Sequence, residues 1–220
     1  MDESRELPRA APGWGKARIL AIGHSTRSLD ELVDLLCSCG VATLADVRSI
    51  PGSRRNPQFS QEVLARSLAE AGIRYVHMGR LGGLRHPRKD SPNGGWRNAS
   101  FRGYADHMQT GKFEEGLVEL RALVRDGPVA IMCAEAVPWR CHRSLIADAL
   151  FARGVVVEHI VGKSRTHPHR LTPFAVRDGR RVAYPPKADE SASDALPLAT
   201  SAARAEPGVA LGRGARGQKS

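Results

Sequence analysis

The sequence predicts a single α/β domain of three-layer, Rossmann-like build, with a mostly parallel sheet of about five strands. Short apolar runs alternate with amphipathic segments, which is typical of parallel strands joined by helices. The chain has 220 residues, of which 41% are hydrophobic, enough to bury one core. Its four cysteines are too few for a secreted disulfide scaffold.

Short apolar runs are expected to form the strands. Each of them contains β-branched residues and is followed by polar or glycine-rich sequence, where a strand would end. The expected strands comprise residues 17–22, 41–47, 73–77, 128–133 and 155–160.

Amphipathic segments with capping residues are expected to form the helices. Ser28 and Glu31 make a capping box, and Gly40 suits the end of that helix. Ser60 begins a second helix, which stops at Gly72. Three more helices are expected over residues 101–110, 113–124 and 141–153.

The remaining segments lack such periodicity. Residues 78–100 are rich in glycine and proline and predict a long loop, and long loops inside compact domains often carry function. We expect a flexible N-terminus over residues 1–16, the domain over 17–183 and a disordered tail over 184–220. No apolar segment of signal-peptide or membrane-spanning type occurs, so we expect a cytoplasmic protein without a membrane partner.

The net charge of +10 is concentrated in one part of the chain. Residues 48–102 contain eleven Arg or Lys against three Asp or Glu, so this stretch carries +8. Clustered basic residues attract phosphate groups, and arginine suits bidentate phosphate contacts. Nucleic acid or a nucleotide is therefore a candidate partner. The alternative is that the arginine content reflects genome composition alone.

Polar and titratable residues follow the carboxyl end of each expected strand. Ligands bind beyond these ends in open parallel sheets, so we expect these side chains to share one pocket. The catalytic candidates, with Glu135 as acid or base, are Glu135, Cys133, His24, Cys141 and His142. The candidates for binding substrate or phosphate are Ser25, Asp46, Arg48, Ser53, Arg54, Arg55, Gly82, Gly83, Tyr104 and Arg143.

The cysteines allow several interpretations. Cys141 stands at an expected helix start, where backbone N–H groups bind anions and lower a thiol pKa. A redox disulfide between Cys133 and Cys141 is geometrically possible if their Cα atoms come within ~7 Å. The alternative is that both are buried structural residues. The spacing lacks the Cys-x-x-Cys pairing of common zinc sites, so we expect no metal and no cofactor.

A set of short motifs resembles the bacterial domain-of-unknown-function family 488. The motifs are Gly23-His24-Ser25, Asp46-Val47-Arg48, Leu81-Gly82-Gly83, Cys133-Ala134-Glu135 and Cys141-His142-Arg143. The resemblance covers about residues 18–161. It implies that these residues form a shared pocket, but it implies no particular reaction.

Three functions are compatible with these features. The first is recognition or processing of a phosphate-bearing nucleic acid or nucleotide at the pocket. The second is rhodanese-like or phosphatase-like transfer of sulfur or phosphoryl through a cysteine, although Trp139 stands where the phosphatases place an arginine, six residues after Cys133. The third is a nucleic-acid-binding accessory protein without enzymatic activity. We expect the first of these functions, with the second and third as alternatives. The sequence does not give the oligomeric state.

Overall fold

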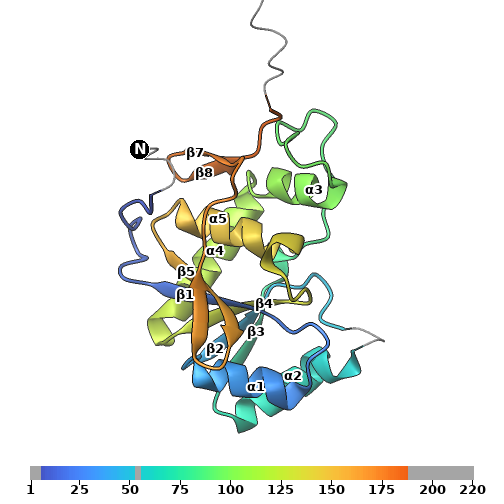
Figure 1. The fold of residues 1–220 in the computed structure, drawn as a ribbon, viewed down its shortest axis with the longest axis vertical. Coiled ribbons are helices and arrows are strands. Elements are labelled where there is room, and N and C mark those ends of the chain that lie inside the picture. Colours follow the sequence, from blue (N-terminus) through green and yellow to red (C-terminus); the bar gives the residue numbers. More distant parts are fainter. Residues whose placement is uncertain (1–5, 53–55, 188–220) are drawn as a thin grey trace, which may run out of the picture. The chain divides into compact units, whose positions relative to one another are not determined.

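A six-stranded sheet forms the centre of the protein (Figure 1). The structure, a computed structural model, describes residues 6–52 and 56–187. The strand order is β3-β2-β4-β1-β5-β6, and the first five strands of that order are parallel. These are β1 (Arg18–Gly23), β2 (Thr43–Asp46), β3 (Arg74–His77), β4 (Val129–Cys133) and β5 (Val156–Gly162). The predicted α/β fold with a mostly parallel sheet is confirmed.

Three strands were not predicted. β6 (Arg165–Pro168) pairs antiparallel with β5 at the edge of the sheet. β7 (Val176–Asp178) and β8 (Arg181–Ala183) form a separate hairpin. All three are short and largely polar, so they lack the apolar runs that predicted the other strands.

Helices cover both faces of the sheet, as the three-layer prediction requires (Figure 1). One core packs β1 and β4 against α1 (Leu29–Ser38) and α2 (Gln61–Glu70). The opposite core packs the same strands against α4 (Gly111–Leu123) and α5 (Arg143–Phe151). The alternation of strand side chains explains this division, because Ile19 belongs to one core and Leu20 to the other.

The capping residues act as the sequence predicts. Ser28 Oγ accepts a hydrogen bond from the backbone N–H of Glu31, and Ser60 caps α2 in the same way. α3 (Ala99–His107) begins two residues earlier than expected because Asn98 caps it. None of the described helices is long and apolar enough to cross a membrane.

Packed residues extend beyond the predicted domain boundaries at both ends. Trp14 is buried in the core shared with α4 and α5. Tyr184 is fully buried, and its hydroxyl donates a hydrogen bond to Asp148 at 2.8 Å. Packing against the core therefore includes residues on either side of the predicted bounds at 17 and 183. Residues 188–220, most of the predicted disordered tail, lie outside the described residues.

A buried carboxylate organises the glycine-rich loop between β3 and α3. Asp106 accepts hydrogen bonds from the backbone N–H of Arg88, from Ser91 Oγ and from Asn93 Nδ2. The loop thus has a defined path beside the carboxyl edge of the sheet.

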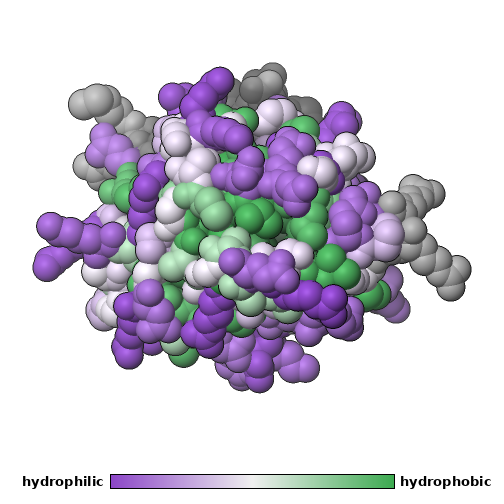
Figure 2. All heavy atoms as spheres, turned by 90° about the horizontal axis from the view of Figure 1, so that it is seen from below, coloured by the Kyte–Doolittle hydropathy of each residue, from purple (hydrophilic) through white to green (hydrophobic). Residues whose placement is uncertain are grey.

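The surface on the side where α1 and α2 lie is largely hydrophilic, with hydrophobic residues gathered at its centre (Figure 2).

Candidate functional site

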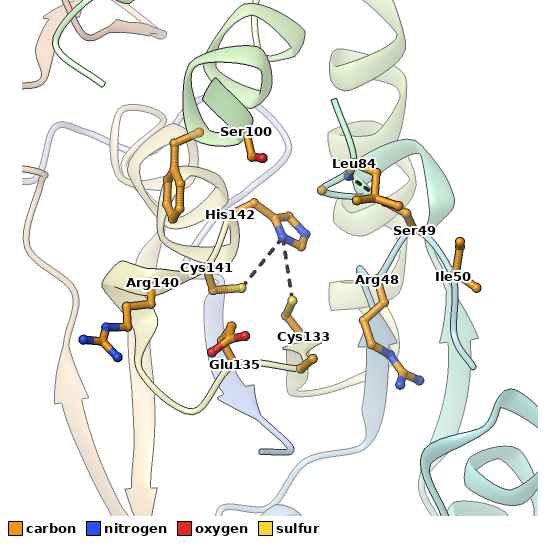
Figure 3. A pocket seen from close by; sticks show the side chains of 13 residues that line it. Arg48, Ser49, Ile50, Leu84, Ser100, Cys133, Glu135, Arg140, Cys141 and His142 are labelled. Atoms are coloured by element: carbon orange, nitrogen blue, oxygen red, sulfur yellow. Dashed lines mark hydrogen bonds between the residues drawn. The ribbon is translucent and has the colours of Figure 1, made fainter. Parts of the chain in front are cut away.

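Two cysteines and a histidine meet at the carboxyl end of β4. Cys133 is the last residue of β4, and Cys141 and His142 lie directly before α5. Each cysteine Sγ lies 3.7 Å from His142 Nδ1 (Figure 3). The eight-residue separation in sequence is closed by the segment 134–140, which leaves the sheet and returns to the start of the helix. The sequence-based prediction placed these three residues in one pocket, and the structure brings them together.

The orientation of the His142 ring fixes which nitrogen faces the sulfurs. Its Nε2 lies 2.9 Å from the carbonyl oxygen of Val47. A carbonyl only accepts hydrogen bonds, so Nε2 carries a proton and donates it. Nδ1 is therefore the atom that exchanges a proton with the two cysteines. The ring also packs against Tyr104, with 4.9 Å between the ring centroids.

Gly83 leaves the space that the His142 ring occupies, so we expect Gly83→Ala to displace the ring. A Cβ at this position would lie 2.4 Å from His142 Nδ1, closer than atoms approach in proteins. We expect a loss of stability of about 1–3 kcal/mol and slower alkylation of Cys133. Urea denaturation and the rate of reaction with iodoacetamide measure the two effects. Gly79→Ala is the matched control, since its Cβ would lie 3.4 Å from His77. Equal alkylation rates in both variants would contradict this role of Gly83.

The two cysteines differ in their ionisation. The pKa of Cys133 lies well below its usual value because Cys141 and His142 donate hydrogen bonds to its sulfur and the Arg143 cation is near, which together outweigh burial. The pKa of Cys141 is raised, because its proton is held by Cys133 and the group is buried. Cys133 is thus the thiolate and Cys141 the thiol of the pair.

Arg143 is a buried cation without a carboxylate partner among the described residues. Its guanidinium donates to the carbonyl oxygens of Glu135 and Ala136, at 3.3 and 3.4 Å, and its Nε has no partner in the described part of the chain. Burial lowers the pKa of Arg143, while Cys141 and Cys133 favour its charge. Thiolate and guanidinium are therefore each other's counter-charge. Gly23 permits this arrangement, since a Cβ there would lie 1.8 Å from the Glu135 oxygen.

Arg48 is held by the protein rather than presented to a ligand. Asp46 accepts hydrogen bonds from Arg48 Nε at 2.9 Å and from its terminal nitrogen at 2.6 Å, and that nitrogen also donates to the Phe59 carbonyl. Tyr75 donates to the same carboxylate at 2.8 Å. Burial opposes the charge of Arg48, but the hydrogen bonds to Asp46 prevail and raise its pKa. Figure 3 shows its guanidinium turned away from the two sulfurs.

The predicted pocket is divided into two neighbouring cavities. One of about 420 Å³ is lined by Cys133, Cys141 and His142, with Arg48 and Gly83 at its walls. The other, of about 370 Å³, is lined by His24 and Ser25. The segment 134–140 borders both, and the exposed side chains of Glu135 and Arg140 line each of them.

Several predicted site residues lie outside the first cavity. Tyr104 is fully buried and donates its hydroxyl proton to the Leu81 carbonyl. Gly82 packs against Ser49, where a Cβ would lie 2.8 Å from the serine Oγ. The predicted phosphate contacts at Ser53, Arg54 and Arg55 fall outside the described residues.

His24 belongs to the second cavity. Its ring stacks on Phe59, with 4.1 Å between the centroids, and Nδ1 lies 2.9 Å from the Ser25 carbonyl. Burial lowers its pKa. Ser25 adopts a left-handed backbone conformation, with φ of 53°, which turns the chain after β1.

The sequence-based reasoning missed part of the cavity wall. Ser49, Leu84 and Arg140 line the first cavity, and Ser49 Oγ accepts a hydrogen bond from the Leu84 N–H at 2.8 Å. Arg140 directly precedes the Cys-His-Arg motif, so its place in the sequence could have predicted that it lines this cavity. The pairing of Ser49 with Leu84 joins segments 35 residues apart and has no local signature.

The three ligand atoms of Cys133, Cys141 and His142 lie within 4.8 Å of one another. This separation suits one thiophilic metal ion, and two sulfurs with one imidazole nitrogen is a donor set that zinc accepts. His24 is not in this group. The cluster can therefore act as a proton-sharing thiol pair or as a three-ligand metal site.

Fold and site together define an α/β protein with a Cys-Cys-His cluster at the carboxyl edge of a parallel sheet. The chain belongs to the family described as Domain of unknown function DUF488, whose sequence model matches residues 28–150. No curated protein and no solved structure matches the chain. This match confirms the predicted resemblance, and the description of the family names no reaction.

Proposed function

We propose that this protein is a thiol-dependent enzyme in which Cys133 attacks an electrophilic substrate bound in the 420 Å³ cavity. The observation that carries the proposal is the surroundings of Cys133 Sγ. The sulfur lines the cavity, takes hydrogen bonds from Cys141 and His142, and has the buried Arg143 as counter-charge. A thiolate is the nucleophilic form of cysteine, and these groups stabilise it.

The neighbouring residues take distinct roles in this proposal. Cys133 forms the bond to the substrate, and the displaced group leaves with a proton that His142 returns from Nδ1. Cys141 keeps its proton and stabilises the thiolate by donating to it. Glu135 and Arg140 are exposed at the cavity wall, where a carboxylate and a cation contact polar parts of the substrate.

The cavity favours a substrate with an apolar portion. Ile50, Leu84 and Phe101 line it, and the first two are 68% exposed. The guanidinium groups of Arg48 and Arg143 are engaged within the protein, so they leave little for the three oxygens of a phosphoryl group. Transfer of sulfur suits the site better. The Cys133 thiolate attacks the outer sulfur of a sulfane-sulfur donor such as a thiosulfonate, whose S–S bond breaks as the sulfinate leaves, and an acceptor thiolate then takes the outer sulfur from the persulfide and restores the Cys133 thiolate.

Alkylation kinetics test the proposal. With Cys37 and Cys39 replaced by serine, iodoacetamide reports on Cys133 and Cys141, and mass spectrometry separates the two. Because the pKa of Cys133 is lowered, we expect its alkylation rate to level off at a pH well below ~8.5, the value for a free cysteine. His142→Gln removes the Nδ1 partner and is expected to move this midpoint upward. Cys133→Ser is expected to abolish the reaction at low pH.

Two results would contradict the thiol mechanism. The first is a midpoint for Cys133 at or above ~8.5 in the otherwise unchanged site. The second is stoichiometric zinc in the purified protein, held by both cysteines and His142, because a metal-bound thiolate is not free to attack. Elemental analysis before and after chelation distinguishes these outcomes.

The basic residues of the glycine-rich loop between β3 and α3 support a second candidate function, which is binding of a nucleic acid. Lys89 and Arg97 are exposed, and neither forms an ion pair with another described residue. By contrast, Arg80 is paired with Glu115 and Glu119. The same loop supplies Leu84 to the cavity wall. We propose that a phosphate backbone follows the two free cations and leads to the cavity.

Fluorescence anisotropy with labelled single- and double-stranded DNA and RNA tests this second candidate. We expect binding that weakens with salt, and a slope that falls by about 2 in Lys89→Ala/Arg97→Ala, since each lost phosphate contact contributes ~0.9. Arg80→Ala is the control, because acidic neighbours already neutralise that residue. An accessory protein without activity would bind nucleic acid while Cys133 has an ordinary alkylation profile. No binding at low salt would exclude the nucleic-acid function.

A further inference from the structure

A third cavity, of about 690 Å³, lies between the segment 136–139 and the β5–β6 edge of the sheet. None of the residues that line it also lines the 420 Å³ cavity. Its volume is in the range of sites for small molecules. Three histidines face it from β5, from β6 and from the segment that follows β6, namely His159, His167 and His169.

A chain of hydrogen bonds fixes the proton positions at this cavity. Asp148 on α5 is fully buried and accepts a hydrogen bond from His169 Nε2 at 2.9 Å. Thr172 and Tyr184 also donate to its carboxylate, which holds the acceptor in place. In the neutral form of His169 the ring proton is on Nε2, so Nδ1 accepts from His159 Nε2, which lies 3.0 Å away. His159 therefore keeps its lone pair on Nδ1.

That lone pair has no partner among the described residues. His159 is 8% exposed, and its Nδ1 is buried without a hydrogen bond in the described part of the chain. Burial lowers the pKa of His159 to about 3, with His169, Arg143 and His167 acting in the same direction. The ring thus stays neutral, and Nδ1 is a permanent acceptor. Buried polar atoms are nearly always hydrogen-bonded in proteins, so this acceptor points to a ligand that donates a proton to it.

The remaining walls indicate the shape and charge of that ligand. Trp139 lines the cavity and is 72% exposed, which is unusual for a large aromatic side chain and offers a face for stacking. Val161 and Pro138 add apolar surface. Arg170 is exposed at the rim and forms no ion pair with any described residue, so it offers a free positive charge.

We propose that this third cavity binds a nucleoside monophosphate, as a planar heterocycle with an N–H donor and an attached anion. The base stacks on Trp139 and donates a hydrogen bond to His159 Nδ1, while the phosphate pairs with Arg170. The proposal is independent of the thiol chemistry, since no residue of the Cys-Cys-His cluster lines this cavity.

Calorimetry on the full chain tests the proposal with the four ribonucleoside monophosphates, with inorganic phosphate as the comparison. At least one nucleotide is expected to bind more tightly than phosphate. Trp139→Ala is expected to weaken that binding about tenfold, the size of a lost stacking contact. Arg170→Ala is expected to weaken it and to reduce its dependence on salt. Leu84→Ala, at the wall of the other cavity, is the control and leaves the affinity unchanged.

His159→Phe keeps a ring of similar size but removes the acceptor, so it is expected to weaken nucleotide binding. Trp139 and Arg170 are exposed, and their variants keep the test valid should the His159 variant fail to fold. The proposal is overturned by no binding of any of the four nucleotides at millimolar concentration. It is also overturned by equal affinity for phosphate and nucleotide, or by unchanged affinity in both surface variants.

Discussion

Asp46→Ala is expected to destabilise the folded protein by about 3–5 kcal/mol, the usual cost of removing one partner of a buried ion pair. The side chains of Asp46 and Arg48 are 0% and 7% exposed. Without the carboxylate, the Arg48 cation stays buried and Tyr75 loses its acceptor. Urea denaturation measures the effect as a lower midpoint with an unchanged slope.

The pair formed by Arg74 and Asp126 is a matched control, since its side chains are 59% and 62% exposed. Asp126→Ala is expected to cost less than about 1 kcal/mol, because solvent screens an exposed pair. In Asp46→Ala/Arg48→Met no unpaired charge remains, and much of the stability is expected to return. A loss for Asp46→Ala no greater than that for Asp126→Ala would contradict the structural role of Arg48.

Arg143→Met is expected to raise the pKa of Cys133 while leaving both cysteines and His142 in place. The substitution removes the buried cation near the thiolate, whereas the hydrogen bonds from Cys141 and His142 remain. Each unit of increase lowers the thiolate fraction, and hence the alkylation rate at low pH, about tenfold. Arg140→Met is the control, because Arg140 lines the same cavity but is exposed.

The same substitution is expected to change how stability depends on pH. The folded pKa of Cys133 is depressed, so its thiolate contributes stability above the unfolded value of ~8.5, and this contribution is lost as the pH falls through the folded pKa. In Arg143→Met the folded pKa of Cys133 moves closer to its unfolded pKa, so the pH-dependent part of the free energy of unfolding becomes smaller. Urea denaturation at several pH values measures this part. An alkylation midpoint equal to that of Arg140→Met would show that Arg143 does not stabilise the thiolate.

Local sequence signals account for most of the fold. The five parallel strands are apolar runs, and Ser28 and Ser60 cap helices where the pattern predicted them. The edge strand β6 has the sequence Arg-Thr-His-Pro, which carries no apolar signal, because one side of an edge strand faces solvent. Its pairing with β5 is decided by tertiary structure and could not be predicted.

The grouping of the two cysteines with the histidine was predicted, but the contacts of the residues around them were not. Cys133, Cys141 and His142 follow one strand, so the carboxyl-end rule for parallel sheets brought them together. Arg143 was expected to bind phosphate, yet it holds the carbonyls of residues 135 and 136. That role depends on burial, which the motif does not encode. The 690 Å³ cavity was not predicted because Asp148, His169 and His159 come from separate elements.

One short segment forms part of the wall of three cavities. Residues 134–140 border the 420 Å³ cavity and the His24 cavity, and residues 136–139 border the 690 Å³ cavity. A ligand that moves this segment in one cavity therefore changes the shape of the others. Such coupling is reciprocal for binding free energies, so two ligands linked in this way alter each other's affinity by the same factor. We therefore expect ligands of neighbouring cavities, where both bind, to influence each other through this segment.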